Sequence, residues 1–270
     1  MKIYAIVNQK GGVGKTTSVV NIGGYLADAG WRVLLVDMDP QSNATSGLGF
    51  DKNKIEKSTY DLLMHAASLD EILIEHEELG LSLLPANPDL AGAEVELVRE
   101  MAREYRLKRA LEQAEGRFDY VLIDCPPSLS LLTINALTAA RDGVLIPVQC
   151  EYLALEGLTQ LMQTLEMVRS YLNEELSIRG MMMTMYDSRT NLSRQVVEEV
   201  RSHFPGKVFR TIIPRSVRLS EAPSYGQPIH VYAPSSPGGV AYKVLTAELV
   251  KGDSVPQGDS TPQKAKGRKE

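Results

Sequence analysis

The chain carries the segment Asn8-Gln9-Lys10-Gly11-Gly12-Val13-Gly14-Lys15-Thr16-Thr17 near its start. An apolar run over residues 3–7 precedes this segment, and a helical pattern over residues 16–29 follows it. A strand, a glycine-rich turn and a helix in this order form a phosphate-binding loop, because glycines let successive backbone N–H groups converge on phosphate oxygens. The positive N-terminal end of the helix adds to the attraction. The segment therefore predicts a nucleotide site at the end of the first strand.

Two side chains of this loop have expected chemical roles. Lys15 is placed to reach the β- and γ-phosphates, and the Thr16 hydroxyl to ligate Mg²⁺. The usual spacing G-x-x-x-x-G-K-[ST] is broken, because Gln9 stands where the first glycine would be. The chain has K-G-G-x-G-K-T instead, with a second lysine at Lys10. A glycine-rich turn without a ligand is the disfavoured alternative.

Acidic residues follow two further apolar runs, in Val36-Asp37-Met38-Asp39-Pro40-Gln41 and in Ile123-Asp124-Cys125-Pro126-Pro127. In a parallel sheet, residues at the carboxyl ends of neighbouring strands meet at the crevice where ligands bind. One aspartate there can hold Mg²⁺ or its waters, and another can orient the attacking water of a phosphoryl transfer. An aspartate that ends a strand is often only a turn former or helix cap, but three strand ends meeting at one loop favour the catalytic interpretation.

Short continuous apolar runs alternate with helical patterns along the chain. Continuous runs are typical of parallel strands covered on both faces, so we expect an α/β fold: a mostly parallel, twisted sheet flanked by helices on both faces. The expected strands are residues 3–7, 33–36, 81–84, 120–123, 143–146 and 180–185. The expected helices are residues 16–29, 96–114, 131–140, 155–171 and 192–204, and residues 51–61 are expected to form a loop. We expect a single domain over residues 1–250 and a disordered polar tail over residues 251–270.

Composition narrows the class of protein. The 270 residues are 43% apolar, and the two cysteines fit a reducing cytoplasm rather than a secreted disulfide framework. The net charge of −5 argues against a nucleic-acid partner only if the charges are spread evenly. They are not: residues 51–100 hold twelve acidic and four basic residues, whereas residues 176–250 hold nine basic and five acidic residues. The basic excess predicts a local anion-binding face, with ordinary surface charge as the alternative.

The segments K-G-G-V-G-K-T-T, V-D-M-D-P-Q and I-D-C-P-P-S resemble the deviant Walker A, switch I and Walker B segments of the ParA/MinD ATPases. Within that group, residues 39–49 (DPQSNATSGLG), 184–193 (TMYDSRTNLS) and 213–223 (IPRSVRLSEAP) resemble the chromosomal ParA proteins, also called Soj. The resemblance covers roughly residues 1–250. It implies a cytoplasmic, nucleoid-associated ATP hydrolase that uses ATP and Mg²⁺ and segregates chromosomes or plasmids.

The resemblance also implies roles for individual residues. Lys10 would reach the nucleotide of a second subunit, so that ATP is sandwiched in a homodimer; Asp39 would position or activate water. Mg²⁺ would be supported by Thr16, Asp124 and Asp39. Segments near Met185 and Pro214 would wall the adenine, and Glu151 would approach the nucleotide across the dimer. The expected nucleotide-binding residues are Lys10, Gly11, Gly12, Val13, Gly14, Lys15, Thr16, Thr17, Glu151, Met185 and Pro214.

By the same resemblance, the ATP-bound dimer binds double-stranded DNA without sequence preference through Arg189 and Arg218. Arg215 would extend this surface, together with Arg194, Arg201, Lys207 and Arg210; a solvated or ion-paired surface arginine is the alternative for each. A ParB-like centromere-binding protein is the expected partner, which stimulates hydrolysis and release.

Three other functions are weighed against this one. A membrane-bound positioning ATPase of the MinD type would carry a C-terminal amphipathic helix, and residues 251–270 have no such pattern, so we expect no membrane partner. A metabolic P-loop enzyme shares only the phosphate-binding loop. An orphan ParA protein that positions another cargo shares all the motifs and stays open. Two isolated cysteines do not supply the spacing of an iron–sulfur cluster, and the four histidines lack metal-ligand spacing.

Overall fold

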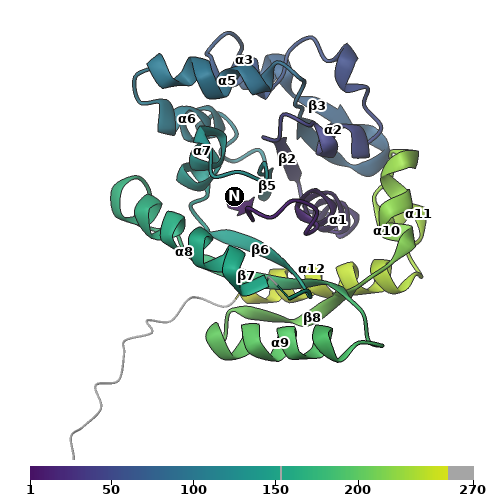
Figure 1. The fold of residues 1–270 in the computed structure, drawn as a ribbon. Coiled ribbons are helices and arrows are strands. Elements are labelled where there is room, and N and C mark those ends of the chain that lie inside the picture. Colours follow the sequence, from purple (N-terminus) through teal and green to yellow (C-terminus); the bar gives the residue numbers. More distant parts are fainter. Residues whose placement is uncertain (153, 255–270) are drawn as a thin grey trace, which may run out of the picture.

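The computed structural model describes residues 1–152 and 154–254. Eight strands form one sheet in the order β3-β4-β2-β5-β1-β6-β7-β8 (Figure 1). Their bounds are β1 (Lys2–Ile6), β2 (Val33–Asp37), β3 (Ile74–His76), β4 (Leu81–Leu84), β5 (Tyr120–Asp124), β6 (Val144–Gln149), β7 (Ile178–Tyr186) and β8 (Val208–Pro214). All neighbouring strands are parallel except β3, which pairs antiparallel with β4. The predicted fold class, a mostly parallel sheet between helices, is confirmed.

Helices cover both faces of the sheet, because the parallel strands expose apolar side chains on each side. On one face the core includes residues of α3 (Thr59–Leu63), α4 (Leu69–Ile72), α5 (Leu90–Glu96), α6 (Arg106–Glu112), α7 (Leu131–Ala139), α8 (Ala154–Tyr171) and α9 (Asn191–His203). On the other face it includes residues of α1 (Lys15–Asp28), α2 (Asn43–Gly47), α10 (Val217–Glu221), α11 (Ile229–Tyr232) and α12 (Pro237–Asp253). The two layers are visible in Figure 1, with α7 and α8 opposite α1 and α12.

The register of the central strands creates the site. Asp37 of β2 lies directly beside Asp124 of β5, and Asp124 also pairs with Ile6 at the end of β1. The loop that follows β1 therefore starts next to both carboxylates. From β1 the chain continues into strands on one side of the sheet and later into β6 on the other side, which makes this edge a topological switch point where ligands bind.

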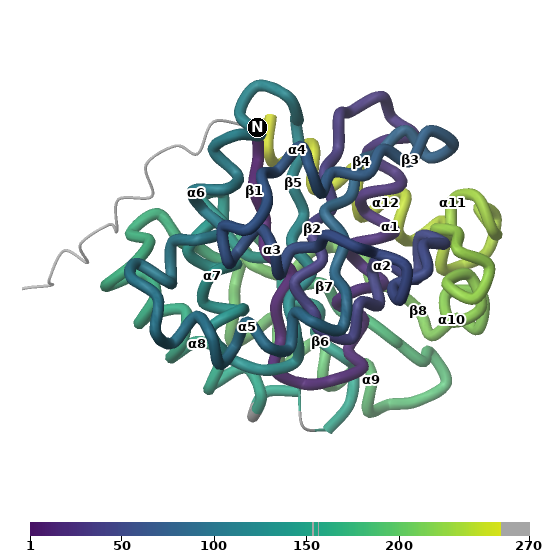
Figure 2. The backbone as a smooth tube through the Cα atoms, turned by 90° about the horizontal axis from the view of Figure 1, so that it is seen from above, coloured from purple at the N-terminus to yellow at the C-terminus, as the bar shows by residue number. Residues whose placement is uncertain are grey.

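The last helix ends near the amino-terminal ends of the central strands, on the side of the sheet away from the phosphate-binding loop. The Asp253 carboxylate accepts hydrogen bonds from the hydroxyls of Tyr4 (2.7 Å) and Tyr120 (3.1 Å) and from Arg179 Nε (2.8 Å). Figure 2 shows the yellow end of α12 beside the N-terminus. Because Asp253 and Arg179 are both largely buried, their ion pair fixes α12 to the sheet.

Several expected boundaries need correction. The helix expected over residues 96–114 is broken: α5 ends at Glu96, short 3-10 turns follow, and α6 begins only at Arg106 after Ala102 adopts a φ of 50°. The loop expected over residues 51–61 contains the start of α3, which Ser58 and Asp61 cap. Two edge strands, β3 and β8, were not expected.

The expected domain end after residue 250 and the tail expected from residue 251 are also revised. Lys251 and Asp253 belong to α12, and the contacts of Asp253 tie them to the core. The rest of the expected tail, residues 255–270, lies outside the described residues.

Candidate nucleotide-binding site

The loop between β1 and α1 has the backbone of a phosphate cradle. Gly12 and Gly14 adopt φ values of 73° and 94°, which side chains rarely allow. A Cβ on Gly11 or Gly12 would meet nothing within 4 Å among the described residues, so this side of the loop is open to a ligand. The Asn8 side chain bonds the Pro147 carbonyl (2.7 Å) and accepts from the Lys10 amide (3.0 Å), which fixes the loop to β6.

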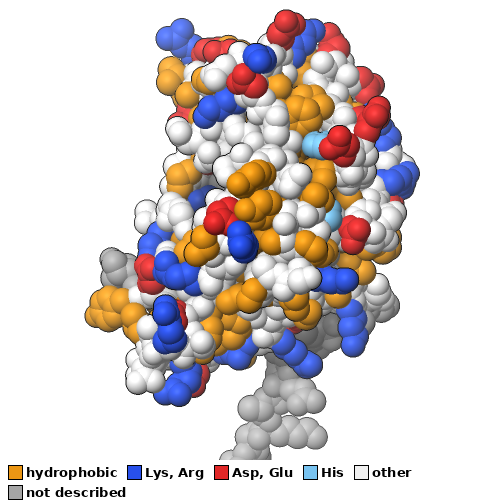
Figure 3. Space-filling view, turned by 90° about the vertical axis from the view of Figure 1, so that its right-hand side faces the viewer, with side chains coloured by type: hydrophobic (Ala, Val, Ile, Leu, Met, Phe, Trp, Pro, Cys, Tyr) orange, Lys and Arg blue, Asp and Glu red, His pale blue; other side chains and the backbone are white. Residues whose placement is uncertain are grey.

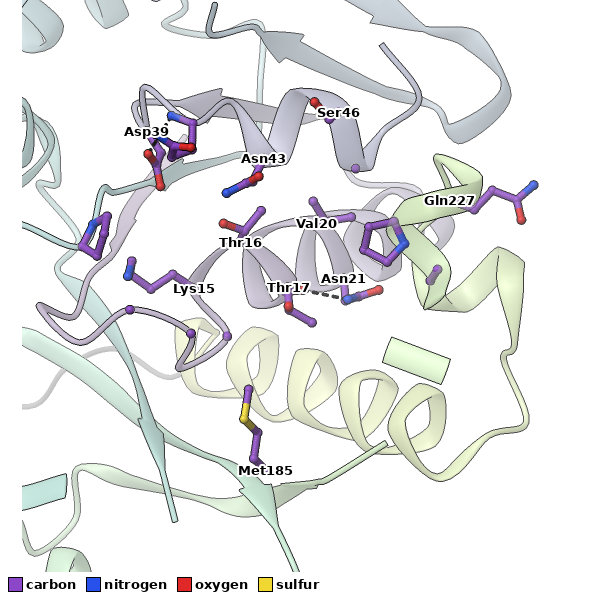
Figure 4. Close-up of a pocket in the computed structure, with 18 residues that line it drawn as sticks. Lys15, Thr16, Thr17, Val20, Asn21, Asp39, Asn43, Ser46, Met185 and Gln227 are labelled. Atoms are coloured by element: carbon purple, nitrogen blue, oxygen red, sulfur yellow. Dashed lines mark hydrogen bonds between the residues drawn. The ribbon is translucent and has the colours of Figure 1, made fainter. Parts of the chain in front are cut away.

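A cavity of about 450 Å³ opens in front of this loop. Figure 4 shows Lys15, Thr16 and Asp39 on one side of it, with Asn43 and Ser46 above and Met185 below. The lining comes from the loop and α1 (Gly11, Gly12, Gly14, Lys15, Thr16, Thr17, Val20, Asn21), from the segment after β2 (Asp39, Gln41, Asn43, Ser46, Gly47), and from Pro127, Met185, Ala222, Pro223 and Gln227. Its size and its mixed polar and apolar walls suit a small-molecule ligand.

Lys15 is the buried cation of the cavity. It is 7% exposed, and its ammonium donates a hydrogen bond to the Lys10 carbonyl at 3.3 Å. Burial lowers the pKa of Lys15, whereas the charges of Asp124, Cys125 and Asp39 oppose that shift. A desolvated ammonium attracts phosphate oxygens strongly, because little water competes for it.

Asp124 is the most unusual group of the site. It is fully buried, and neither carboxylate oxygen has a hydrogen-bond partner within the described part of the chain. Burial and the neighbouring Asp37 raise the pKa of Asp124 well above its usual range, although Thr16 and Lys15 act in the opposite direction. A buried carboxylate without partners is costly unless a cation binds it. With the Thr16 hydroxyl on the cavity wall, this donor set fits Mg²⁺, which prefers oxygen ligands.

The two aspartates after β2 have different surroundings. The Asp37 Oδ2 accepts hydrogen bonds from the Thr45 amide (2.9 Å) and hydroxyl (2.7 Å), so Asp37 anchors α2 against the sheet. Burial outweighs these bonds and raises the pKa of Asp37 to about 6. Asp39 lines the cavity, and its Oδ1 accepts from the Gln41 amide at 2.9 Å. The sequence motif contained Asp37, but only the structure separates its anchoring role from the position of Asp39 on the cavity wall.

Lys10 and Glu151 pair outside the cavity. Lys10 Nζ lies 3.4 Å from one Glu151 oxygen, and Arg215 Nη2 lies 3.4 Å from the other. The Gln149 side-chain Nε2 also donates to Glu151, at 2.6 Å. Neither Lys10 nor Glu151 lines the cavity of its own chain. Glu151 thus connects a loop lysine to one of the arginines expected at the basic face.

Of the remaining residues expected to contact the nucleotide, one lines the cavity and two do not. Met185 lines the cavity and adopts a φ of 52°, an uncommon conformation for a non-glycine residue. Pro214 and Val13 do not line it: Pro214 ends β8, and the Val13 carbonyl accepts a bond from Thr184 at 2.9 Å. The far wall is formed instead by Ala222, Pro223 and Gln227, which the sequence analysis did not single out. The 213–223 motif overlaps this wall and was the available signal.

The segments after β7 and β8 that carry Arg189, Arg215 and Arg218, here called the arginine loops, lie at the same carboxyl ends of the strands as the phosphate-binding loop. Tyr186 pairs with Pro214 in register, so the loop that holds Arg189 and the segment that holds Arg215 and Arg218 leave neighbouring strands together. All three side chains are largely exposed. On the face shown in Figure 3, blue side chains are concentrated in the lower half and red ones towards the upper right. The ends of β7 and β8 thus bring the segments of Arg189, Arg215 and Arg218 together, whereas Lys207 and Arg210, which were expected to extend this surface, lie toward the other end of β8.

Two kinds of feature are absent from the described residues. No group of three or more His, Cys, Asp or Glu side chains with the arrangement of a metal site is found among them. Within the same residues, no helix is both long and apolar enough to cross a membrane.

Comparisons with known proteins identify close relatives. A family described as an AAA domain matches residues 1–178. The sporulation initiation inhibitor protein Soj of Bacillus subtilis is 57% identical over 248 residues, which cover 92% of this chain and 98% of that protein. The chromosome partitioning protein ParA of Myxococcus xanthus is 53% identical over 253 residues, which cover 94% and 89%. The crystal structure of cobyrinic acid a,c-diamide synthase from Mycobacterium smegmatis with bound ADP and magnesium superposes with a TM-score of 0.83 at 41% identity, covering 93% of this chain and 94% of that one.

Proposed function

This chain belongs to the ParA/MinD family of P-loop ATPases, and we propose that it is a Mg²⁺-dependent partitioning ATPase whose ATP-bound dimer binds DNA without sequence preference. One observation carries the proposal beyond family membership. The phosphate-binding loop and the arginine loops after β7 and β8 lie at the same edge of one sheet. Nucleotide state and DNA contact can therefore influence each other over a short path.

Different residues of the cavity bind the phosphates of ATP, hold Mg²⁺ and orient water. The open backbone of Gly11 and Gly12 cradles the phosphates, and Lys15 neutralises their charge from a desolvated position. Thr16 and Asp124 would hold Mg²⁺, which supplies charge neutralisation between the phosphates. Asp39, on the cavity wall, orients the attacking water.

A second copy of the chain completes the site in this proposal. Lys10 lies outside its own cavity and is held by Glu151. In a dimer, Lys10 exchanges this carboxylate for the phosphates bound to the other subunit, whose larger negative charge favours the exchange. Arg215 shares Glu151 with Lys10, so the exchange also changes the surroundings of a DNA-facing arginine.

The DNA-binding surface of the dimer is built from the arginine loops. Arg189 and Arg218 project from neighbouring segments, and dimerisation doubles their number against a single duplex. Hydrolysis stimulated by a ParB-like partner would dissolve the dimer and release the DNA. This cycle places the protein on the nucleoid.

Two alternatives differ from this function. A ParA-type ATPase that positions another cargo would share the ATP and DNA chemistry and differ only in its partner. The diamide synthase of Mycobacterium smegmatis is named for amide formation. If this chain had that activity, it would consume ATP only in the presence of a corrinoid acid and a nitrogen donor. ADP release with DNA and a ParB-like protein, but without a corrinoid acid, would separate partitioning from synthesis.

The first experiment measures DNA binding. Anisotropy of a labelled duplex should rise with ATP and fall steeply with salt, and Arg189→Glu combined with Arg218→Glu should abolish the rise. The matched control is Arg117→Glu combined with Arg169→Glu, two exposed, ion-paired arginines outside the arginine loops. Binding that is independent of ATP, or equal loss in the control, would refute the proposal.

The second experiment tests Asp39. Asp39→Ala removes a cavity-wall carboxylate without touching the phosphate cradle, so the variant should dimerise with ATP and bind DNA but hydrolyse ATP poorly. Light scattering gives the oligomeric state, and ADP release gives the turnover. Turnover at the wild-type rate would remove Asp39 from the catalytic role.

A further inference from the structure

Arg189 and Arg218, the two arginines on which the proposed DNA contact chiefly depends, are already paired with carboxylates of their own chain. Arg189 Nε donates to Asp187 Oδ1 at 2.9 Å, and Nη2 donates to Asp187 Oδ2 at 2.7 Å. The pair is bidentate even though 84% of the Arg189 side chain is exposed. A phosphate group binds arginine through the same forked geometry.

The Asp187 carboxylate is itself held in place. Its Oδ1 also accepts a hydrogen bond from the Arg189 backbone amide at 3.0 Å. The bonds from Arg189 hold the pKa of Asp187 below its usual range, so this residue is ionised at neutral pH. It is therefore a fixed negative charge beside the arginine.

Arg218 has an equivalent partner on a different element. Its Nη1 donates to Glu221 Oε2 at 2.8 Å, one helical turn away on α10. The Tyr232 hydroxyl donates to the same oxygen at 3.1 Å and restrains the carboxylate. A turn after β7 and the helix α10 thus present the same arrangement, an exposed arginine with a restrained acidic partner.

This arrangement weakens each contact with DNA. A phosphate that approaches Arg189 or Arg218 either displaces the carboxylate or binds next to its negative charge, and both cost affinity. We propose that Asp187 and Glu221 set the DNA affinity of the protein: they keep each protomer too weak to hold DNA alone, so that retention requires the doubled surface of the dimer. The inference rests on the DNA binding proposed above and adds the residues that tune it.

The opposite role is also physically possible for these carboxylates. If they orient the arginines towards phosphates, their removal would loosen the side chains and weaken binding. The sign of the change in affinity therefore separates the two roles.

The test replaces each carboxylate by its neutral isostere, in Asp187→Asn and Glu221→Gln. Asparagine keeps an oxygen that can accept the Arg189 amide bond, and Glu221→Gln tests the idea on a second element if the first loop is disturbed. The control is Glu166→Gln, whose glutamate pairs with Arg169 at 2.9 Å with the same i,i+3 spacing but on α8. All three variants change the net charge by the same amount.

The readout is anisotropy of a short mixed-sequence duplex, titrated with each protein in ATP at several KCl concentrations. We expect Asp187→Asn and Glu221→Gln each to bind about threefold tighter per protomer, a gain within the range of exposed ion pairs. The slope of log affinity against log salt should steepen by about 0.9 for each arginine released. The double variant should also retain DNA without ATP at low salt, and Glu166→Gln should match wild type.

Unchanged or weaker binding of both variants, with normal ATP-dependent binding of wild type, would overturn this inference and leave the proposed function intact. An equal gain in Glu166→Gln would overturn it too, because net charge would then be the cause. If wild type itself fails to bind DNA with ATP at the lowest salt, the proposed function fails and this inference falls with it.

Discussion

The buried carboxylate of Asp124 should lower the free energy of unfolding of the ligand-free protein. Its carboxylate is fully buried and has no hydrogen-bond partner within the described residues. A buried polar group left unsatisfied costs about 1–3 kcal/mol, and more when it is charged. An amide of the same shape cannot ionise, so Asp124→Asn removes the cost of the buried charge, and we expect it to raise the free energy of unfolding by about 2 kcal/mol in the absence of Mg²⁺ and nucleotide. For a chain of this size the melting temperature should rise by about 4–8 °C.

The pH dependence of this gain has a defined sign. The pKa of Asp124 is raised by burial above the ordinary value of 3.8, so the folded chain keeps a proton that the unfolded chain has released. Wild-type stability then falls as pH rises from about 4 to the raised pKa, by about 1.4 kcal/mol for each pH unit in that window. The advantage of Asp124→Asn should accordingly be larger at pH 8 than at pH 5.

Mg²⁺ and ATP should reverse the ranking. A ligand that binds only the folded state stabilises it in proportion to its affinity, and the variant lacks the carboxylate that fits the cation. Thermal melts in EDTA and in Mg-ATP would measure both effects, with ADP release expected to be lost in Asp124→Asn. Asp119→Asn is the control of opposite sign: Arg32 holds the pKa of Asp119 at about 2, so its loss should destabilise the protein at neutral pH. An Asp124→Asn variant that melts below wild type in EDTA at pH 8 would refute the reasoning.

Two further predictions concern stability and nucleotide affinity. Asp253→Ala leaves Arg179 buried without its carboxylate and should lower the free energy of unfolding by about 3–5 kcal/mol, measured by urea denaturation; unchanged stability would mean that the ion pair does not anchor α12. Gly226→Ala places a Cβ 2.6 Å from the Gly49 Cα at a φ of 64°, so it should separate two segments next to the nucleotide cavity and weaken ATP binding. Calorimetric titration with ATP would check this, and wild-type affinity would contradict it.

The sequence predicted the parts of the fold that depend on strong local patterns. The central strands are continuous apolar runs and were found within one to three residues of their ends. The edge strand β8 was missed because Arg210 and Thr211 interrupt its apolar pattern; their backbone amides bond the Glu248 carboxylate of α12, a distant contact. The break between α5 and α6 depends on the backbone of Ala102, which no turn-forming residue marks in the sequence.

The site was predictable where one motif supplies one function. Asp39 and most residues of the loop over residues 10–17 line the cavity, because a phosphate cradle is built from neighbours in the sequence. Lys10 and Val13 are the loop residues that do not line it. The pair of Lys10 with Glu151 joins residues 141 positions apart, and spacing along the chain carries no sign of it. The far wall at Ala222 and Gln227 is equally non-local, and its residue types have no characteristic chemistry.

The uneven charge has a spatial consequence that explains how a protein of net charge −5 could bind DNA. The acidic residues 51–100 include β3 and β4 at one edge of the sheet, and the basic residues 176–250 include β7 and β8 at the other. Seven steps between strands, at about 4.8 Å each, separate the two edges by roughly 34 Å. The Debye length at physiological ionic strength is about 8 Å, so charges at the β3 edge are screened from a duplex at Arg189, which follows β7. Arg218 differs, because the chain that follows it returns to the β3 edge, where Tyr225 and Val231 share a hollow with Glu77. For Arg189, the carboxylate that can weaken DNA binding is therefore the near one, Asp187, and not the more numerous acidic residues at the β3 edge.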